Sequence, residues 1–263
     1  MNQITKIVQQ IGNGGHIYLP REIVGQKVVI SLVEKSIGDI EEEILTLLKP
    51  YLKQVEGIYL YGSYSRNEQT TESDIDVLVI TDGKIEIKKK VNEYEITCAT
   101  IEQIENTLKN NAVLILPILR ESRAILNGGL IKKYTTMKLN KKNTSWYIET
   151  TESALKLAKY AVEEDKITDM PGIVYSLILR LRGLLLIKLL IDEENYSNKK
   201  AIDYLIKDKI QREKAEQEYR MYREHRDDKS ISKNSLNAKD MGSLYKSVYN
   251  LYFEVKSIWE KLK

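Results

Sequence analysis

The spacing of apolar residues along the chain changes twice, which predicts three regions of different structure. Residues 1–35 hold short β-like runs around a glycine-rich turn. Residues 36–135 alternate between helix and strand patterns, and residues 136–263 keep helical spacing almost throughout. This order predicts an α+β protein. It would combine a small β module, a mixed sheet flanked by helices, and an all-α helical bundle.

Two segments of the first region have strand character, on either side of a polar stretch. They are His16–Pro20 and Lys27–Ser31. About 35 residues are too few to bury an independent core. We therefore expect this module either to pair with a second copy of the chain or to pack on the rest of the protein.

In the middle region the spacing of apolar residues alternates between a helical period and a strand period. We expect helices over Ile37–Lys53, ending near Pro50, and beginning at Ser63 and Ile101. The strands expected here cover four segments: Gly57–Tyr61, Asp74–Ile80, Glu93–Thr97 and Ala124–Leu126.

The last region is expected to form a bundle of five helices. Their expected positions are Trp146–Glu164, Pro171–Ile191, a short helix after the N-cap residue Ser197, Lys209–Asp227 and Lys239–Leu262. The most apolar stretch, Gly172–Ile191, contains Arg180, Arg182 and Lys188. Three cations are rare at the centre of a bilayer span, so we read it as a buried helix and expect no membrane partner.

Composition and charge indicate the compartment of the protein but no specific partner. The 263 residues carry a formal net charge of +3, which does not by itself predict nucleic-acid binding. The single Cys98 excludes an internal disulfide framework, and the first ten residues lack the apolar core of a signal peptide. Both features favour a cytoplasmic protein.

The chemistry of the chain concentrates in a short segment of the middle region. Gly62 and Ser63 follow a strand and begin a helix, so backbone N–H groups and a hydroxyl can face a phosphate. Asp74 and Asp76 follow two residues apart on the next strand, which points both carboxylates to one side. Two close carboxylates repel each other, and a divalent cation relieves that repulsion. Mg²⁺ suits such a site because it takes one or two carboxylates plus substrate phosphates.

This segment resembles the Gly-Ser…Asp-x-Asp signature of the polymerase-β nucleotidyltransferase superfamily, and it is closest to the minimal nucleotidyltransferases. That family leads with Gly-Ser-x-Ala-Arg-Gly, whereas this chain has Ser65 for the alanine and Asn67 for the glycine. The resemblance implies that Gly62 and Ser63 hold the triphosphate, that Asp74 and Asp76 hold Mg²⁺, and that Arg66 contacts phosphate.

The family also uses a third carboxylate on a later strand, as a metal ligand or as base for the acceptor. Glu95 matches that position, and Glu93 on the same face is the alternative. The implied reaction is attack by an acceptor hydroxyl on the α-phosphate of an NTP, with release of pyrophosphate and two Mg²⁺ ions in place. ATP is the family's default donor. Protein, RNA and small-molecule acceptors all stay open.

The helical region resembles the HEPN bundles that accompany minimal nucleotidyltransferases. HEPN ribonucleases carry an Arg followed by a His after four to six residues, and Arg220 and His225 have that spacing. An arginine there stabilises phosphate charge and a histidine acts as acid or base. The alternative is an exposed charged helix beside the cleft, on which Arg220, Arg223 and Arg226 form a basic strip.

The first 35 residues resemble AbrB-like swapped-hairpin modules, which dimerise and bind DNA. The resemblance rests on Gly12–Glu22 and Gly25–Val28, and it implies DNA as a partner and a homodimer. His16 is interpreted as a plain strand residue. Two rival functions follow for the whole chain: a toxin–antitoxin-like fusion with an RNA-cutting or RNA-binding bundle, and a non-catalytic DNA-binding regulator.

Overall fold

The computed structural model describes residues 4, 6, 8–30, 35–70, 73–163, 170–207, 211–226 and 237–262. The chain divides into two compact units, residues 1–47 and 48–263. The expected boundaries after residues 35 and 135 stay predictions.

The first unit contains a hairpin of β1 (Gln9–Ile11) and β2 (Gly14–His16), a 3₁₀ turn and most of one helix. Gln9 pairs with His16 across a turn in which Gly12 has a φ of +56°. The expected strand beyond His16 is wrong, and residues 27–30 also form no strand; Ser31 lies outside the described residues. A strand needs hydrogen-bonded neighbours, and within the described residues this hairpin pairs over only three positions.

The helix of the first unit, α1 (Ile37–Leu48), begins and ends where its polar flanks predict. The backbone N–H of Ser36 donates to the Asp39 carboxylate over 3.0 Å, and that of Asp39 donates to the Ser36 hydroxyl over 3.2 Å. Pro50 lies in the 3₁₀ turn that follows. The expected end of the helix near Pro50 is confirmed.

The second unit begins with a five-stranded mixed sheet in the order β5-β6-β4-β3-β7. Its strands are β3 (Val55–Tyr61), β4 (Ile75–Thr81), β5 (Lys90–Val91), β6 (Tyr94–Thr100) and β7 (Arg123–Leu126). β4 and β6 run parallel, whereas the other neighbours are antiparallel. The four strands expected from the sequence are confirmed, and β5 was not expected.

Two helices join the sheet to the bundle. Helix α3 (Ile101–Glu121) starts at a capping box between Thr100 and Gln103 and is kinked at Asn111. It packs on β6 at one end and on the bundle helices α5 and α6 along its length. Helix α4 (Gly128–Thr135) was not expected, because two glycines open it and mask its helical pattern.

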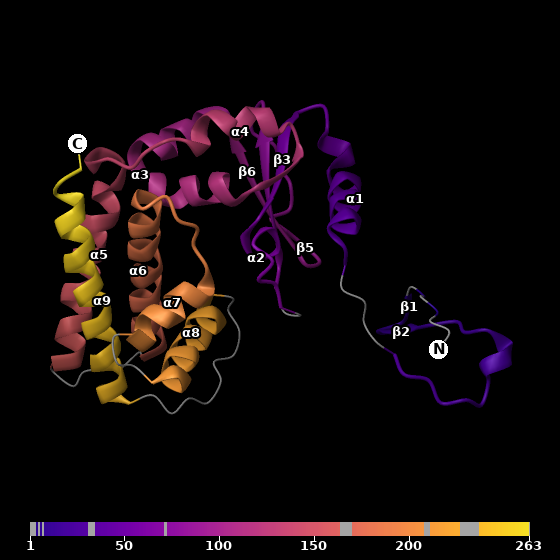
Figure 1. The fold of residues 1–263 in the computed structure, drawn as a ribbon. Helices are drawn as coiled ribbons and strands as arrows, with labels where there is room; N and C mark the ends of the chain where they lie inside the picture. The colour runs from indigo at the N-terminus through magenta and orange to yellow at the C-terminus, as the bar shows by residue number, and fades with distance from the viewer. Residues whose placement is uncertain are drawn as a thin grey trace. The chain divides into compact units, whose positions relative to one another are not determined.

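The bundle helices lie where the apolar spacing predicts them, apart from ends that fall outside the described residues (Glu164, Lys209 and Asp227). They are α5 (Lys141–Glu163), α6 (Met170–Ile191), α7 (Asn198–Lys207), α8 (Arg212–Arg226) and α9 (Ala238–Trp259). Helices α5, α6 and α9 run side by side (Figure 1). Ser197 caps α7 as expected, because its hydroxyl accepts the Lys200 N–H over 3.0 Å.

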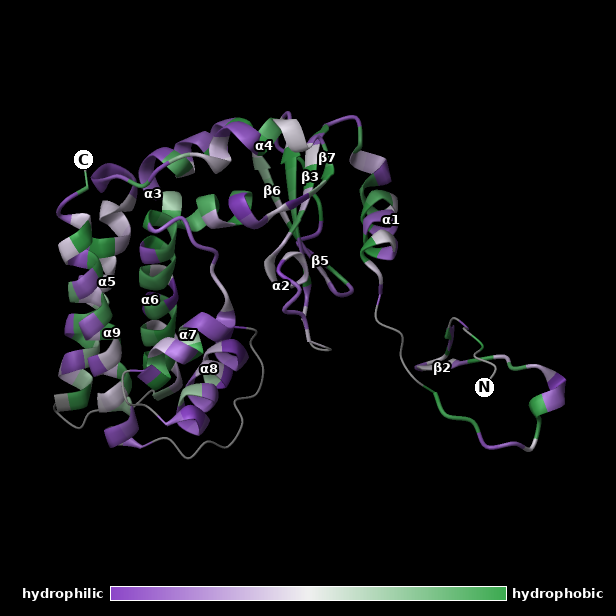
Figure 2. Ribbon diagram, viewed as in Figure 1, coloured by the Kyte–Doolittle hydropathy of each residue, from purple (hydrophilic) through white to green (hydrophobic). Residues whose placement is uncertain are grey.

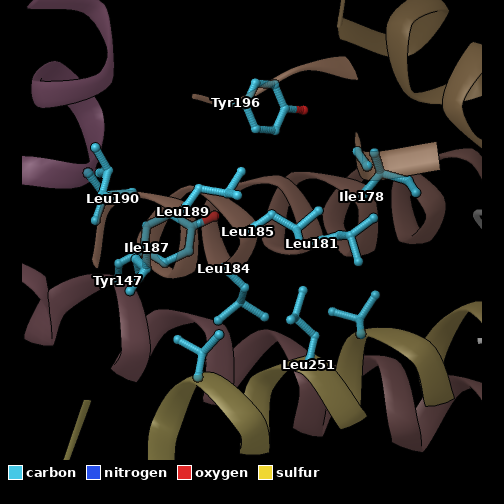
Figure 3. Close-up of a cluster of buried hydrophobic side chains, with 14 of the residues drawn as sticks. Tyr147, Ile178, Leu181, Leu184, Leu185, Ile187, Leu189, Leu190, Tyr196 and Leu251 are labelled. Carbon is cyan, nitrogen blue, oxygen red and sulfur yellow. The ribbon is translucent and has the colours of Figure 1, made fainter. Parts of the chain in front are cut away.

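Helix α6 is the centre of the bundle. Apolar side chains along it are buried against the neighbouring helices (Figure 3). Figure 2 shows α6 mostly in the colours of hydrophobic residues and α8 mostly in those of hydrophilic ones. No helix in the described part of the chain is long and apolar enough to cross a membrane. The burial of the α6 side chains confirms the expectation that Gly172–Ile191 is a buried helix.

Candidate active site

The turn between β3 and α2 (Gly62–Ser65) carries the first half of the motif. Gly62 has a φ of +73°, and a Cβ at this position would overlap the carboxylate of Asp76. Only glycine fits here, because an L side chain would be strained as well as in collision. The turn therefore brings the backbone of Gly62 directly against a carboxylate of the second half of the motif. Ser63, the next residue, is half-buried.

Asn67, where the minimal nucleotidyltransferases have glycine, has a φ of +55°. Asparagine is one of the few L residues that tolerates this left-handed region. The departure from the family pattern therefore keeps the backbone conformation that a glycine would allow.

Asp76 on β4 lies beside Glu95 on the parallel strand β6, because the two residues are register partners. Burial raises the pKa of Asp76 to about 7, and the charge of Glu95 is the next cause. The positive charges of Arg226 and Arg66 act in the opposite direction. The sheet thus holds two carboxylates side by side, the half-buried one of Asp76 and the exposed one of Glu95.

Asp74 comes just before β4 and adds its negative charge to those acting on Asp76. The Lys90 ammonium lies 3.1 Å from its carboxylate. Lys90 is on β5, so the unexpected edge strand brings a cation to this end of the motif. Glu93, the alternative third carboxylate, precedes β6, and its main-chain carbonyl accepts the Ile75 N–H over 2.7 Å.

These residues fit a hard divalent cation, because every side chain of the set offers carboxylate oxygen. In the described part of the chain, no three His, Cys, Asp or Glu side chains are gathered closely enough to hold a metal by themselves. Mg²⁺ sites of this kind complete their ligands with substrate phosphates and water. The ammonium of Lys90 shows that the Asp74 carboxylate attracts a cation.

Arg66 lies at the end of the turn, but its guanidinium is occupied by protein carboxylates. Its Nη1 donates to both carboxylate oxygens of Glu121 over 2.8 Å, and its Nε donates to Glu68 over 3.0 Å. Glu121 also accepts the Gly62 N–H over 3.1 Å. Sequence reasoning missed Glu121, since it lies 55 residues from Arg66 and belongs to no motif.

The helical region borders this site at three residues, Tyr196, Asn198 and Arg226. The main-chain N–H of Asn198, the first residue of α7, donates to the Glu68 carboxylate over 3.5 Å. The guanidinium of Arg66 lies 5.9 Å from the centre of the Tyr196 ring. Arg226, at the end of α8, acts electrostatically on Asp76.

Arg220 and His225 differ in their surroundings. Arg220 is exposed, and so are Arg223 and Arg226. His225 is half-buried with its ring 4.9 Å from that of Tyr175. Five positions on a helix turn by about 140°, so Arg220 and His225 face different directions. A ribonuclease role for this pair stays a prediction.

The N-terminal hairpin places His16 with its ring against Tyr18, at a centroid distance of 4.8 Å. None of the described residues between 4 and 30 is buried. DNA binding and dimerisation through residues 1–35 stay predictions.

Comparison with known proteins identifies the middle of the chain. Residues 42–132 match the family described as "Polymerase beta, Nucleotidyltransferase". A stretch of 48 residues is 50% identical to the "Putative protein adenylyltransferase MJ0128" of Methanocaldococcus jannaschii, and covers 17% of this chain and 48% of that protein. The chain therefore spans about half the length of this curated relative.

A solved structure described as "Crystal structure of the toxin-antitoxin with AMP-PNP" is 17% identical. The match covers 49% of this chain and 98% of that one, with a TM-score of 0.27. A TM-score this low does not establish a shared fold.

Proposed function

We propose that residues 42–132, which match the polymerase-β nucleotidyltransferase family, form a nucleotidyltransferase domain that transfers AMP from ATP to a hydroxyl acceptor. The observation that carries this proposal is the pairing of Asp76 with Glu95, next to the Gly62 turn. Two carboxylates held together against their repulsion are what a magnesium-bound triphosphate needs. A purely structural strand face has no reason to keep them side by side.

In this proposal the motif residues bind the triphosphate, hold the metal ion and assist the acceptor hydroxyl. Gly62 and Ser63 receive the triphosphate, and Asp74 and Asp76 hold Mg²⁺. Bound Mg²⁺ would neutralise the negative charge of the triphosphate and of the departing pyrophosphate. Glu95 completes the ligand set or takes the proton of the acceptor hydroxyl.

The reaction exchanges one bond at the α-phosphorus for another. The acceptor oxygen forms a bond to it, and the bond from it to the β-phosphate bridging oxygen breaks. The hydroxyl proton passes to Glu95 in the base role, and pyrophosphate leaves with the electron pair of the broken bond. No redox step or further co-reactant is required.

ATP and a protein hydroxyl are the preferred substrates, because the archaeal relative is named as a protein adenylyltransferase. An RNA end and a small molecule are the other acceptor classes. We propose that Arg220, Arg223 and Arg226, exposed on α8, line the acceptor side, since Arg226 acts on Asp76 from that helix. All three acceptor classes can carry negative charge that such a strip would attract.

The test is incubation of the purified protein with each α-labelled NTP and Mg²⁺, with and without cell extract. We expect label from ATP to move to a protein band. We expect Asp74→Ala/Asp76→Ala to abolish that transfer. Absence of label on any acceptor, together with unchanged NTP binding in the double variant, would reject the proposal. Label on RNA or on a small molecule would keep the reaction and correct the acceptor.

The ribonuclease alternative has its own variant. His225→Ala should abolish RNA cleavage and leave nucleotide transfer intact if the bundle cuts RNA. In the structure His225 is half-buried on α8, with its ring against that of Tyr175. RNA that stays intact in the presence of the wild-type protein excludes this alternative.

Dimerisation through residues 1–35 is the second part of the proposal. Large apolar side chains of this segment are exposed, among them Tyr18 at 75%, Val24 at 79% and Val29 at 94%. A second copy of the chain would cover them, as a small module requires. Deleting residues 1–35 should turn a dimer into a monomer in light scattering and leave nucleotide transfer in place. Loss of all DNA binding on the same deletion would add DNA as a partner.

A further inference from the structure

Glu121, the last residue of α3, contacts the Gly62 turn through both its side chain and its main chain. Its carboxylate accepts the Gly62 N–H over 3.1 Å and is bonded through both oxygens to Arg66 over 2.8 Å. Its main-chain carbonyl accepts the Ser65 hydroxyl. The first, fourth and fifth residues of the turn are thus held by one residue.

The contacts of Arg66 explain what this arrangement does to its charge. Its side chain is 16% exposed, as is that of Glu121. A second carboxylate, Glu68, accepts from its Nε over 3.0 Å. Two carboxylates around one guanidinium leave a net negative group. A phosphate would therefore gain little from Arg66, and would have to displace bonds that are already made.

The turn itself is too short to keep its shape unaided. Helix α2 spans only four residues, and its first residue has the unusual φ of +73°. One helical turn is marginal without tertiary support. The support comes from the end of α3, and α3 in turn packs on β6 and on the bundle helices. Ser63 follows Gly62, whose backbone lies against the Asp76 carboxylate.

From these contacts we propose that Glu121 is a positioning residue for nucleotide transfer. Through Arg66 and the Gly62 N–H it fixes the turn, so that Ser63 meets the triphosphate and Arg66 does not. This inference rests on the proposed function. It assigns Arg66 a structural role within the protein, whereas the family motif implies that Arg66 contacts phosphate.

A competing arrangement makes the opposite prediction. If the phosphates took the place of the Glu121 carboxylate at Gly62 and Arg66, the carboxylate would inhibit binding. Removing its charge would then lower the KM for NTP. In the positioning role, the same change raises KM and lowers kcat, because misplacing a binding group by about 1 Å costs up to about 100-fold in rate.

The deciding variant is Glu121→Gln, which keeps the size of the side chain and removes its charge. We expect kcat/KM for NTP to fall about tenfold or more. The matched control is Glu105→Gln on the same helix, where the carboxylate accepts from the Tyr134 hydroxyl over 2.5 Å and from Lys133 over 3.1 Å. This control should lose similar bonds and leave transfer unchanged. An unchanged or raised kcat/KM in Glu121→Gln would overturn the proposal.

A double-mutant cycle separates the roles of Arg66 and Glu121. If Arg66 acts only through the pair, Arg66→Met/Glu121→Gln is no slower than the slower single variant. If Arg66 contacts phosphate independently, the two losses multiply, and the proposal fails.

Two further measurements keep the inference separate from folding and from the proposed function. Thermal unfolding of every variant should match that of Glu105→Gln within a few degrees. If Glu121→Gln does not fold, Glu121→Asp keeps the charge and withdraws the carboxylate from Arg66 and the Gly62 N–H, and an unchanged kcat/KM in that variant overturns the proposal. If the wild type transfers no label, the proposed function fails. The affinity for a non-hydrolysable ATP analogue then decides the inference: equal affinity in wild type and Glu121→Gln rejects it, and weaker affinity in the variant supports it.

Discussion

The carboxylates at the start of β4 and the guanidinium of Arg182 in α6 are both charged groups inside the second unit, but they have opposite surroundings. Asp76 lies beside a second negative charge, and burial raises its pKa to about 7. Arg182 donates to the Tyr196 hydroxyl over 3.0 Å and to that of Tyr222. Its guanidinium also lies 5.6 Å and 5.1 Å from the centres of these two rings.

The difference distinguishes a candidate functional site, at Asp76, from a group that stabilises the fold, at Arg182. The charge of Arg182 is satisfied by neutral hydroxyls and ring faces of its own chain, which stabilises the bundle. The charges of Asp76 and Glu95 oppose each other, so their best partner is a cation brought from outside. Repulsion kept in a fold indicates function, whereas a satisfied charge indicates architecture.

The largest expected effects come from exchanging these two groups for uncharged ones. Asp76→Asn should slow nucleotide transfer by about 1,000-fold, because the proposed metal ligand is lost, and should leave the midpoint of urea unfolding unchanged or higher. Arg182→Met should lower the free energy of unfolding by about 2–3 kcal/mol and leave the transfer rate of the folded protein unchanged. Transfer assays and urea unfolding on both variants check the pair. Loss of transfer in folded Arg182→Met would break the contrast.

Two glycines sharpen the same comparison. A Cβ on Gly62 would overlap Asp76, and a Cβ on Gly183 in α6 would overlap the Tyr147 hydroxyl, which donates to the Leu179 carbonyl over 2.8 Å. Gly62→Ala should reduce transfer by about 100-fold, because the turn moves from the carboxylates.

Gly183→Ala should cost about 1–3 kcal/mol of stability through overpacking, with normal transfer. Rates and unfolding midpoints of the two variants, measured side by side, give the result. A stability loss without a rate loss in Gly62→Ala would show that its tight packing has no role in the site.

Local sequence was enough to predict four strands of the five-stranded sheet and the central motif. The alternation of polar and apolar residues around Asp76 fixes the strand and its face, and the Gly62–Ser63 pair marks the turn. Glu95 was reachable for the same reason, since it lies on a strand of similar pattern. The N-terminal strands were misplaced because pattern alone does not say whether a partner strand exists.

The surroundings of the motif were not predictable. Glu121 reaches Arg66 only because α3 has a particular length and a kink at Asn111. Lys90 reaches Asp74 through a two-residue edge strand, and Arg226 acts on Asp76 from a helix that is distant in sequence. Each of these contacts depends on how elements pack, and side-chain spacing along the chain does not encode that packing.

A smaller effect is expected at Glu218 on α8, a carboxyl group in the bundle that is 1% exposed. Burial raises its pKa to about 8 from an ordinary 4.5, and the charge of Asp240 is the next cause. Since the folded pKa is the higher one, its stabilising contribution is complete below about pH 4.5 and is lost as the pH rises through about 8.

Glu218→Gln should remove that dependence. Wild type should lose stability on the order of 5 kcal/mol relative to this variant between acid and alkaline pH, at about 1.4 kcal/mol for each unit of pKa shift. Urea unfolding across the pH range measures it. Glu216→Gln, an exposed carboxylate on the same helix with Arg212 3.6 Å away, is the control and should change stability by less than about 1 kcal/mol. Parallel pH curves for wild type and Glu218→Gln would contradict the assignment.

The smallest effect is expected at Asn67, where the chain departs from the family glycine. Its φ of +55° is a conformation that glycine adopts freely, that asparagine tolerates, and that alanine adopts at a cost of about 1 kcal/mol. Asn67→Gly should therefore keep the transfer rate within about twofold, and Asn67→Ala should lose about 1 kcal/mol of stability. The pair is measured by NTP kinetics and thermal unfolding. A large rate change in Asn67→Gly would mean that the asparagine side chain, and not its backbone, serves the site. Asn67 would then act together with the carboxylates of the motif. The turn would then join the motif on the functional side of the contrast with the bundle, where groups of the same chain satisfy the charge of Arg182.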